Sequence, residues 1–325
     1  METQRIMWHI FGLELSPYAW SIWFGCAAGL LLFLWEAKRT GVKPAAAGWT
    51  CLLGIVLGLL CARLYYVGAR FELFLELGLE NFFSAVDAEL AAWGSAGGAA
   101  FWGAVGGVCL GALIAGKISG EKVSRLLDAL APSAALAIAV SRFGEFSIGE
   151  GIGPEVMDER LQFFPLAVMN EWEEWNFSVF LLEGLVGLCI FVLLMTVGRK
   201  KTDGYRARMF LVLYASCQIL LEALRRDNFL RWLFVRVSQV ASAVVLLGLI
   251  IFAVLRWSRK PAAERMPRKT LILWCTLFIL MVPLIVLLEF AVDKSPFPSV
   301  AVDYLLEALC CVGMGVSSWQ IVMKN

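Results

Sequence analysis

The sequence predicts an all-α, polytopic integral membrane protein, and its composition supports this class. Of the 325 residues, 60% are apolar and 17% are charged, whereas ordinary globular domains contain about 45–50% apolar and about 25% charged residues. This apolar content exceeds what one soluble core can bury, so a soluble enzyme is excluded. The net charge of +1 gives no indication of nucleic-acid binding.

Apolar stretches of bilayer-crossing length recur along the whole chain. A hydrocarbon core about 30 Å thick requires about 20 apolar residues in a helix. The sixth such stretch carries Gln218 and Glu222 and is therefore weaker on hydropathy alone. The pattern predicts nine spans, at residues 17–35, 47–67, 98–117, 126–141, 176–197, 208–224, 235–255, 270–291 and 300–322.

The placement of basic residues predicts how the spans are oriented. Cytoplasmic loops are enriched in Lys and Arg, and most of the 28 basic residues follow odd-numbered spans, while the loops after spans two and four are acidic. We therefore expect an external N-terminus, a cytoplasmic C-terminus and long external segments at 68–97 and 142–175. The second, which follows span four, contains a candidate hairpin or interfacial segment at 161–169.

Neither the nine cysteines nor the single histidine predicts a metal or redox centre. The cysteines all lie in apolar stretches, their number is odd and no C-x-x-C pair occurs, so we expect small buried apolar side chains. His9 alone cannot form a histidine-based zinc site and argues against a Ser-His-Asp triad. We expect no metal, no cofactor and no cleaved signal peptide.

Ionisable residues inside the predicted spans lie near the outer end of each span. Such residues are rare at membrane depth because removing a charge from water is costly, and they often form functional pairs. A snorkelling arginine beside a carboxylate is the structural alternative for the neighbours Arg142 and Glu145, and for Glu222 and Arg225. The whole set comprises Arg63, Arg142, Glu145, Glu183, Glu222, Arg225, Glu289, Asp303 and Glu307.

The segment SRFGEFSIGEGIG at 141–153 is the main candidate ligand-binding motif. The guanidinium group of Arg142 offers planar donors suited to a phosphate, and Glu145 and Glu150 offer acceptors. Its glycines permit positive φ and a close approach of the backbone to a ligand; they are Gly144, Gly149, Gly151 and Gly153. The composition suits a phosphoryl headgroup.

This motif resembles that of the bacterial prolipoprotein diacylglyceryl transferase family, GRxGNFxNGExxG. Further similar segments follow the family order and extend over about residues 10–255, so we expect a transferase-like membrane domain at 1–258 and a two-helix membrane extension at 259–325. The motif keeps Arg142, Gly144, Phe146, Gly149, Glu150 and Gly153, and the further matches include Tyr18, 62–67, 101–107, 128–132, 181–184, 203–204, Tyr214, Glu222, Arg225, Asp227 and 238–239.

The unrelated run at 173–179 replaces a family segment of the form HPSQLYE, and four single positions also depart from polar residues of the family pattern. Glu145 and Ile148 replace the two asparagines of the central motif, and Trp102 replaces a histidine. Gln218 replaces an arginine on the sixth span. These differences leave open whether conventional catalysis survives and which group acts as the base.

The resemblance implies a transferase of lipoprotein biosynthesis in the bacterial plasma membrane (the cell inner membrane), with its active face toward the outer leaflet. In the family, phosphatidylglycerol donates its diacylglyceryl group to the lipobox cysteine of a prolipoprotein. The implied partners are a phosphatidylglycerol-like phospholipid and a prolipoprotein signal peptide, without nucleic acid. The candidate catalytic residues are Glu222, Glu145, Glu150 and Tyr18, and the candidate substrate-binding residues are Arg142, Gly144, Gly149, Gly153, Arg63, Arg225, Gln218 and Trp102.

Two other functions remain open on the sequence. A catalytically altered homologue would bind phospholipid or a membrane partner without turnover, and the replaced histidine, arginine and asparagines favour it. A transporter is the second alternative. No internal repeat supports it, and the predicted buried charges lie only on the outer side.

Overall fold

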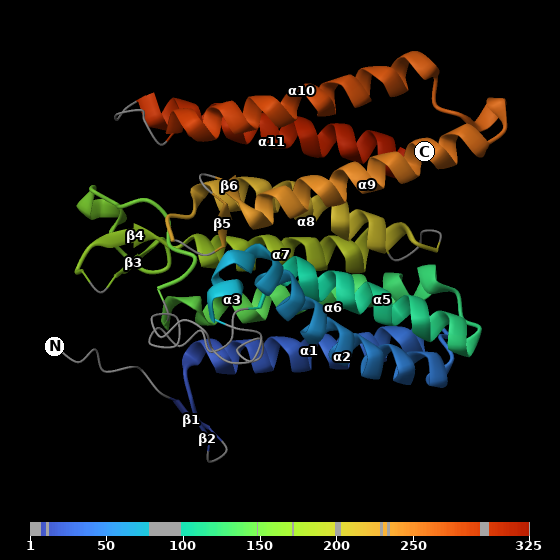
Figure 1. Cartoon of the computed structure of the whole chain (residues 1–325), viewed down its shortest axis with the longest axis horizontal. Helices are drawn as coiled ribbons and strands as arrows, with labels where there is room; N and C mark the ends of the chain where they lie inside the picture. The colour runs from blue at the N-terminus through green and yellow to red at the C-terminus, as the bar shows by residue number, and fades with distance from the viewer. Residues whose placement is uncertain are drawn as a thin grey trace. The chain divides into compact units, whose positions relative to one another are not determined.

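The computed structural model describes residues 8–10, 13–77, 99–147, 149–170, 172–198, 203–227, 230–232, 235–292 and 299–324. Within these residues the chain is helical apart from three short antiparallel hairpins (Figure 1). The hairpins pair β1 (Trp8–Ile10) with β2 (Leu13–Leu15), β3 (Ala167–Met169) with β4 (Trp175–Phe177), and β5 (Arg231–Trp232) with β6 (Val235–Arg236). The candidate hairpin or interfacial segment at 161–169 does not form a hairpin by itself: only its last three residues, 167–169, form a strand, which pairs with 175–177.

Nine helices in the described part of the chain are long and apolar enough to cross a membrane. This confirms the all-α class and the predicted spans, whereas their orientation stays a prediction. The helices are α1 (Pro17–Arg39), α2 (Pro44–Ala69), α5 (Phe101–Ser119), α6 (Val123–Ser141), α7 (Val179–Thr196), α8 (Tyr205–Leu224), α9 (Val237–Arg259), α10 (Arg268–Val292) and α11 (Ser299–Lys324). Shorter elements are α3 (Phe71–Leu77) and the 3-10 helices η2 (Arg142–Ser147), η3 (Glu159–Leu161) and η5 (Ala262–Glu264).

Local sequence signals mark several helix ends. Ser16 caps α1 by accepting a hydrogen bond from the backbone nitrogen of Ala19 at 3.2 Å, and Pro17 occupies the first turn. Gly120 ends α5 in the left-handed conformation with φ of 62°. Much of the expected external segment at 68–97 lies outside the described residues, which resume at residue 99 after α3.

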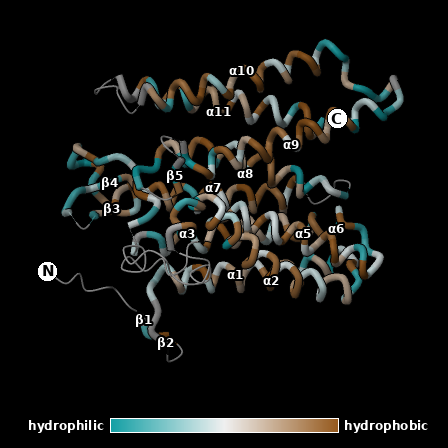
Figure 2. Tube along the Cα trace, in the orientation of Figure 1, coloured by the Kyte–Doolittle hydropathy of each residue, from teal (hydrophilic) through white to brown (hydrophobic). Residues whose placement is uncertain are grey.

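The chain divides into two compact units. The first comprises Met1–Arg206 with Leu224–Leu230, and the second comprises Ala207–Ala223 with Arg231–Asn325. The sequence analysis divided the chain differently, into a transferase-like domain at 1–258 and an extension at 259–325. That division is based on resemblance to the family rather than on packing, and it stays a prediction. Figure 2 shows that hydrophobic residues predominate along the long helices, and many of their large apolar side chains are exposed, as expected for segments that face lipid.

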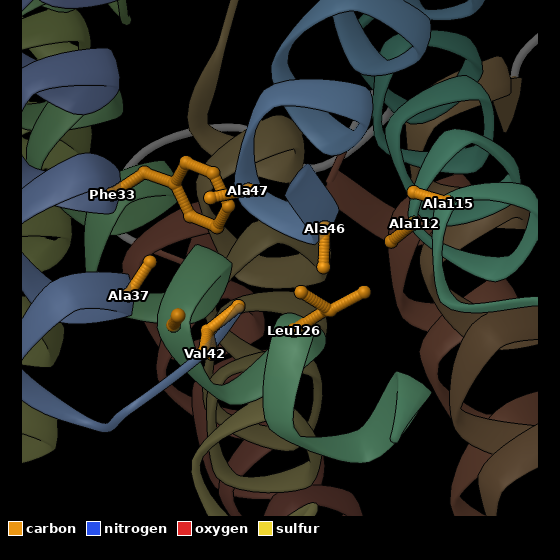
Figure 3. Packing of buried hydrophobic residues seen from close by; sticks show 9 residues of the cluster. Phe33, Ala37, Val42, Ala46, Ala47, Ala112, Ala115 and Leu126 are labelled. Atoms are coloured by element: carbon orange, nitrogen blue, oxygen red, sulfur yellow. The ribbon is translucent and has the colours of Figure 1, made fainter. Parts of the chain in front are cut away.

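Small residues allow close helix packing in the first unit. α2 packs along α5, and a Cβ added at Gly107 of α5 would overlap the carbonyl oxygen of Leu57. Gly111 approaches the backbone of Gly54 in the same way. Figure 3 shows a cluster of buried apolar residues in the same unit. The cluster consists of Phe33, Ala37, Val42, Ala46, Ala47, Ala112, Ala115, Leu126 and Ala129.

The second unit joins part of α8 to α9, α10 and α11. α10 packs along α11, and a Cβ added at Gly315 of α11 would lie 3.1 Å from Cβ of Ser216 on α8. In the most apolar stretch of α8, 56% of the residues are buried, whereas in that of α10 only 17% are buried. The weaker hydropathy of the sixth span therefore belongs to a helix that is largely enclosed by protein.

The cysteines only partly follow the sequence prediction. All nine are free, and Cys310 and Cys311 are buried as expected. Cys26 and Cys189 are exposed on α1 and α7. The expectation of burial is wrong for these two, because a membrane-spanning helix can carry apolar side chains on its outer face as well as in its interior.

Candidate functional site

The central motif begins where α6 passes into η2, which packs against the start of α1. Ser21 donates its hydroxyl hydrogen to the carbonyl oxygen of Ser141 at 2.8 Å, and the backbone nitrogen of Tyr18 donates to Ser147 Oγ at 3.1 Å. A Cβ added at Gly144 would overlap Ser21 Oγ and lie 2.7 Å from Cα of Tyr18. Gly144 thus permits close packing of η2 on α1.

The glycine turn that follows η2 brings a distant carboxylate to the backbone. Gly149 and Gly151 have φ of 67° and 68°, so two of the four motif glycines adopt positive φ. The backbone nitrogen of Gly151 donates to Asp227 Oδ2 at 2.8 Å. A Cβ added at Gly151 would lie 2.5 Å from Glu145 Oε2, whereas one at Gly149 would meet no atom within 4 Å.

One carboxylate on α7, that of Glu183, pairs with two arginines of the first unit, Arg142 and Arg225. Arg142 Nη1 donates to Glu145 Oε1, and Arg142 Nε lies 2.8 Å from Glu183 Oε2. Arg225 Nη1 lies 3.6 Å from Glu183 Oε1, and its Nη2 lies 2.7 Å from Asp227 Oδ2. The structure therefore brings Arg225 close to Arg142 and Glu145, from which it is distant in the sequence.

These five charged side chains, which we call the arginine–carboxylate cluster, are strongly buried. The side chains of Glu183 and Arg225 are 0% and 3% exposed, and Arg142 is the most accessible at 15%. Buried charges lose hydration, so they require partners of opposite sign. The three carboxylates formally outnumber the two arginines, which leaves the cluster acidic when all its carboxylates are ionised.

Glu150 and Tyr18 lie beside this cluster. Burial and the nearby charge of Glu145 raise the pKa of the half-buried Glu150 to about 7, and Arg225 opposes this shift. The phenol of Tyr18 lies within electrostatic range of Glu150, Glu145 and Arg142. A carboxyl group with a pKa near neutrality can exchange a proton under physiological conditions.

A second polar group lies in the second unit and contains two of the predicted residues. Gln218 Nε2 donates to Glu222 Oε1 at 2.8 Å, and Arg236 Nη1 lies 3.8 Å from Glu222 Oε2. Gln239 Nε2 donates to Glu289 Oε2 at 3.2 Å. Gln218, Glu222 and Arg236 are all buried.

Arg63 and Trp102 occupy aromatic surroundings. The Arg63 guanidinium lies over the rings of Tyr66 and Phe74, at 5.4 Å and 5.5 Å from their centroids. Trp102 is 7% exposed and meets the ring of Phe101 edge-on. Their roles in substrate binding, like those of Gly149 and Gly153, stay predictions.

The sequence prediction of the site did not include Glu183, Asp227 or Arg236. Glu183 carried a usable signal, because it is an acidic residue at membrane depth within a family-like Leu-Leu-Glu-Gly segment. Asp227 matched the family pattern but had no predicted role. Nothing in the sequence marked Arg236 as a site residue, because it lies at the start of its predicted span and only the packing of the helices buries it. Among the described residues, no group of three or more His, Cys, Asp or Glu side chains is arranged to hold a metal ion.

The fold and this site define a helical membrane protein with a buried arginine–carboxylate cluster beside a glycine turn. Residues 5–255 match the family model of prolipoprotein diacylglyceryl transferase, and the chain belongs to that family.

Three relatives carry the name phosphatidylglycerol–prolipoprotein diacylglyceryl transferase. The protein of Enterococcus faecalis is 27% identical over 265 residues, which cover 78% of this chain and 91% of the relative. The Clostridioides difficile protein is 26% identical, over 76% and 93% of the two chains. The Streptococcus pyogenes serotype M1 protein is 29% identical, also over 76% and 93%.

Proposed function

We propose that this protein transfers a diacylglyceryl group from phosphatidylglycerol to the lipobox cysteine of a prolipoprotein. Family membership supports this proposal. The observation that carries it is the shared pairing of Arg142 and Arg225 with Glu183, next to the glycine turn. Two guanidinium groups held side by side offer planar donors for a phosphate.

The reaction requires a leaving phosphate, a nucleophile and a base. The cysteine sulfur forms a bond to the terminal glyceryl carbon, and the bond from this carbon to the phosphate oxygen breaks. Glycerol phosphate leaves with the electron pair, and the thiol proton passes to the base. Arg142 is the more accessible arginine of the cluster, so it is the group that we assign to the phosphate, where a cation stabilises the developing charge.

Glu150 is our candidate for the base. Glu145, Glu183 and Asp227 are all paired with arginines, which stabilise their ionised forms and make them weaker proton acceptors. Glu150 is half-buried, and its raised pKa of about 7 suits proton transfer near neutrality. Glu222 is the alternative base, and Tyr18 is assigned a hydrogen bond to the headgroup.

The proposal also covers the orientation of the protein in the membrane and the side from which the substrates enter. The N-terminus lies outside and the C-terminus in the cytoplasm of a bacterial plasma membrane, as the distribution of basic residues predicts. The phospholipid enters from the outer leaflet, and the signal peptide of the prolipoprotein supplies the cysteine. No cofactor takes part in this scheme.

A transfer assay with full-length protein tests the proposal. Phosphatidylglycerol labelled in the acyl chains is incubated with a lipobox peptide, and mass spectrometry detects the thioether adduct on cysteine. We expect an adduct with the wild type and with Arg160→Ala, a control arginine on the exposed η3, and a loss of at least about 100-fold with Arg142→Ala. Absence of an adduct under conditions where the Enterococcus faecalis protein works contradicts the proposal.

Binding of phospholipid without turnover is the second candidate. It is favoured by Gln218, which hydrogen-bonds Glu222 where the resemblance implies an arginine, and by the acidic balance of the arginine–carboxylate cluster. Native mass spectrometry that detects bound phosphatidylglycerol, together with no adduct in the assay, supports this candidate. Family membership lends no support to the transporter alternative.

A further inference from the structure

Helix α10 lies beyond the family match, which ends at residue 255, yet its one carboxylate, that of Glu289, reaches a polar side chain within the matched residues. Glu289 Oε2 accepts a hydrogen bond from Gln239 Nε2 at 3.2 Å. Glu289 is half-buried and lies in the last turns of α10, whereas Gln239 lies in the first turn of α9. A segment outside the family pattern therefore contributes a charged contact to a helix within it.

The side-chain amide of Gln239 connects three elements of the second unit. Its Oε1 accepts a hydrogen bond from the backbone nitrogen of Arg236 at 3.3 Å, which closes a capping box at the start of α9. Its Nε2 donates both to the carbonyl oxygen of Ile219 on α8, at 3.3 Å, and to Glu289. Gln239 is buried, so the loss of one partner cannot be fully replaced by water.

Glu289 and the carbonyl oxygen of Ile219 both favour one orientation of this amide. Each only accepts hydrogen bonds, so together they favour the orientation that turns Nε2 toward α10 and Oε1 toward the backbone nitrogen of Arg236. In the opposite orientation, Gln239 Oε1 would face Glu289 and the carbonyl oxygen of Ile219, so that three acceptors would meet without a donor. The contact with α10 thereby helps to hold the cap at the start of α9.

Arg236, the N-cap residue of α9, carries the charge that faces Glu222. Arg236 is 2% exposed, and its Nη1 lies 3.8 Å from Glu222 Oε2. Glu222 is one of the two carboxylates that we consider as the base. Its geometry depends on Arg236 because a buried ion pair needs a fixed arrangement to offset the loss of hydration.

We propose that Glu289 is a positioning residue, which acts through the Gln239 amide and the Arg236 cap to hold Glu222 in place. The two-helix extension then helps to hold Glu222, a residue of the family-matched part of the second unit. The kinetic part of this inference rests on the proposed transferase function, whereas its structural part does not.

The kinetic test compares three variants of the full-length protein. We expect Glu289→Ala to lower kcat about tenfold with KM changed less than about twofold, because a displaced catalytic group affects turnover more than binding. Glu289→Gln keeps an acceptor oxygen and should retain kcat within about threefold of the wild type. Leu287→Ala, at a 65% exposed position on the same helix, should leave kcat unchanged.

A double-mutant comparison tests whether Glu289 acts through Gln239. Gln239→Ala should lower kcat to a similar extent, and the combination Gln239→Ala with Glu289→Ala should lose no more than the worse single variant. Losses that multiply, or a Glu289→Ala protein with wild-type kcat, overturn the kinetic part of the proposal, which takes Glu222, the alternative base, as the group that accepts the thiol proton.

Hydrogen exchange provides a readout that needs no transferase activity. In nanodiscs, Glu289→Ala should speed amide exchange about tenfold within residues 237–242, while Glu289→Gln and Leu287→Ala should match the wild type. If the variants show these exchange rates but the wild type transfers no diacylglyceryl group, the proposed function fails and the positioning contact stands. Unchanged exchange in folded, monodisperse Glu289→Ala protein overturns the inference.

Discussion

Glu183 on α7 pairs with Arg142 at the end of α6, with 2.8 Å between Glu183 Oε2 and Arg142 Nε. The other carboxylate oxygen, Oε1, lies 3.6 Å from Nη1 of Arg225. A single buried carboxylate thus offsets the mutual repulsion of two guanidinium groups that face the same site. The pairing keeps both arginines in place where a phosphate is proposed to bind.

Replacing Glu183 should destabilise the protein. Glu183→Gln keeps the shape of the side chain but removes the carboxylate that Arg142 and Arg225 share, so that Arg142 keeps Glu145 and Arg225 keeps Asp227. Because each arginine retains one partner, we expect a loss smaller than the about 3–5 kcal/mol that leaving a buried charge unpaired costs. Unfolding in detergent measures this loss, with Glu159→Gln on the exposed η3 as a matched control that should remain within about 0.5 kcal/mol of the wild type. An unchanged unfolding midpoint for Glu183→Gln contradicts the shared pairing.

Glu145 should weaken the binding of an anionic headgroup. Glu145→Asn restores the residue type of the family pattern, removes one negative charge and releases part of the Arg142 guanidinium group. We expect the Kd for phosphatidylglycerol to fall about tenfold, which corresponds to about 1.4 kcal/mol. Native mass spectrometry with lipid titration measures this affinity, and Glu155→Gln, at an exposed position, is the charge-matched control. Equal affinities in the two variants would show that the charge of Glu145 does not act on the headgroup.

The sequence predicted the helices better than it predicted the contacts between polar groups. Span positions follow from apolar length, because each hydrophobic segment is long enough to meet the bilayer requirement by itself. The pairing of Asp227 with the turn at Gly151 joins residues that are 76 positions apart, and no periodicity encodes such a contact. The sequence marked Glu289 as an ionisable residue at membrane depth but not its partner Gln239, and it did not mark Arg236, since these contacts arise only when α8, α9 and α10 pack.

Glu150 should make stability depend on pH in a specific direction. Its pKa rises from the ordinary 4.5 to about 7 in the folded protein, so between these values the folded state keeps a proton that the unfolded state has lost. Unfolding then releases a proton, and the free energy of unfolding contributed by this group falls as the pH rises from about 4.5 to about 7.

The measurement is a comparison of unfolding midpoints at pH 5, 6 and 7.5 for the wild type and Glu150→Gln. We expect the wild-type midpoint to fall more steeply with pH than that of the variant. Glu155→Gln, which removes a carboxylate from an exposed position, should keep the wild-type slope. Parallel curves for the wild type and Glu150→Gln would show that Glu150 has an ordinary pKa.

The two positive-φ glycines of the motif should differ in their tolerance of a side chain. Gly149→Ala introduces a methyl group into open space, so only the left-handed backbone conformation opposes it, at about 1–2 kcal/mol. Gly151→Ala carries the same backbone cost. Its Cβ would also lie 2.5 Å from Glu145 Oε2 and 2.7 Å from Cβ of Phe180, and such crowding adds about 1–3 kcal/mol.

Crowding at Gly151 should also reach the arginine–carboxylate cluster. Moving the turn would lengthen the 2.8 Å hydrogen bond from the Gly151 nitrogen to Asp227, the residue that pairs with Arg225. We therefore expect Gly151→Ala to lower both the unfolding midpoint and the transfer rate more than Gly149→Ala does. Because the two variants share the same chemical change and nearly the same φ, equal effects would contradict the close contact between the turn and Glu145.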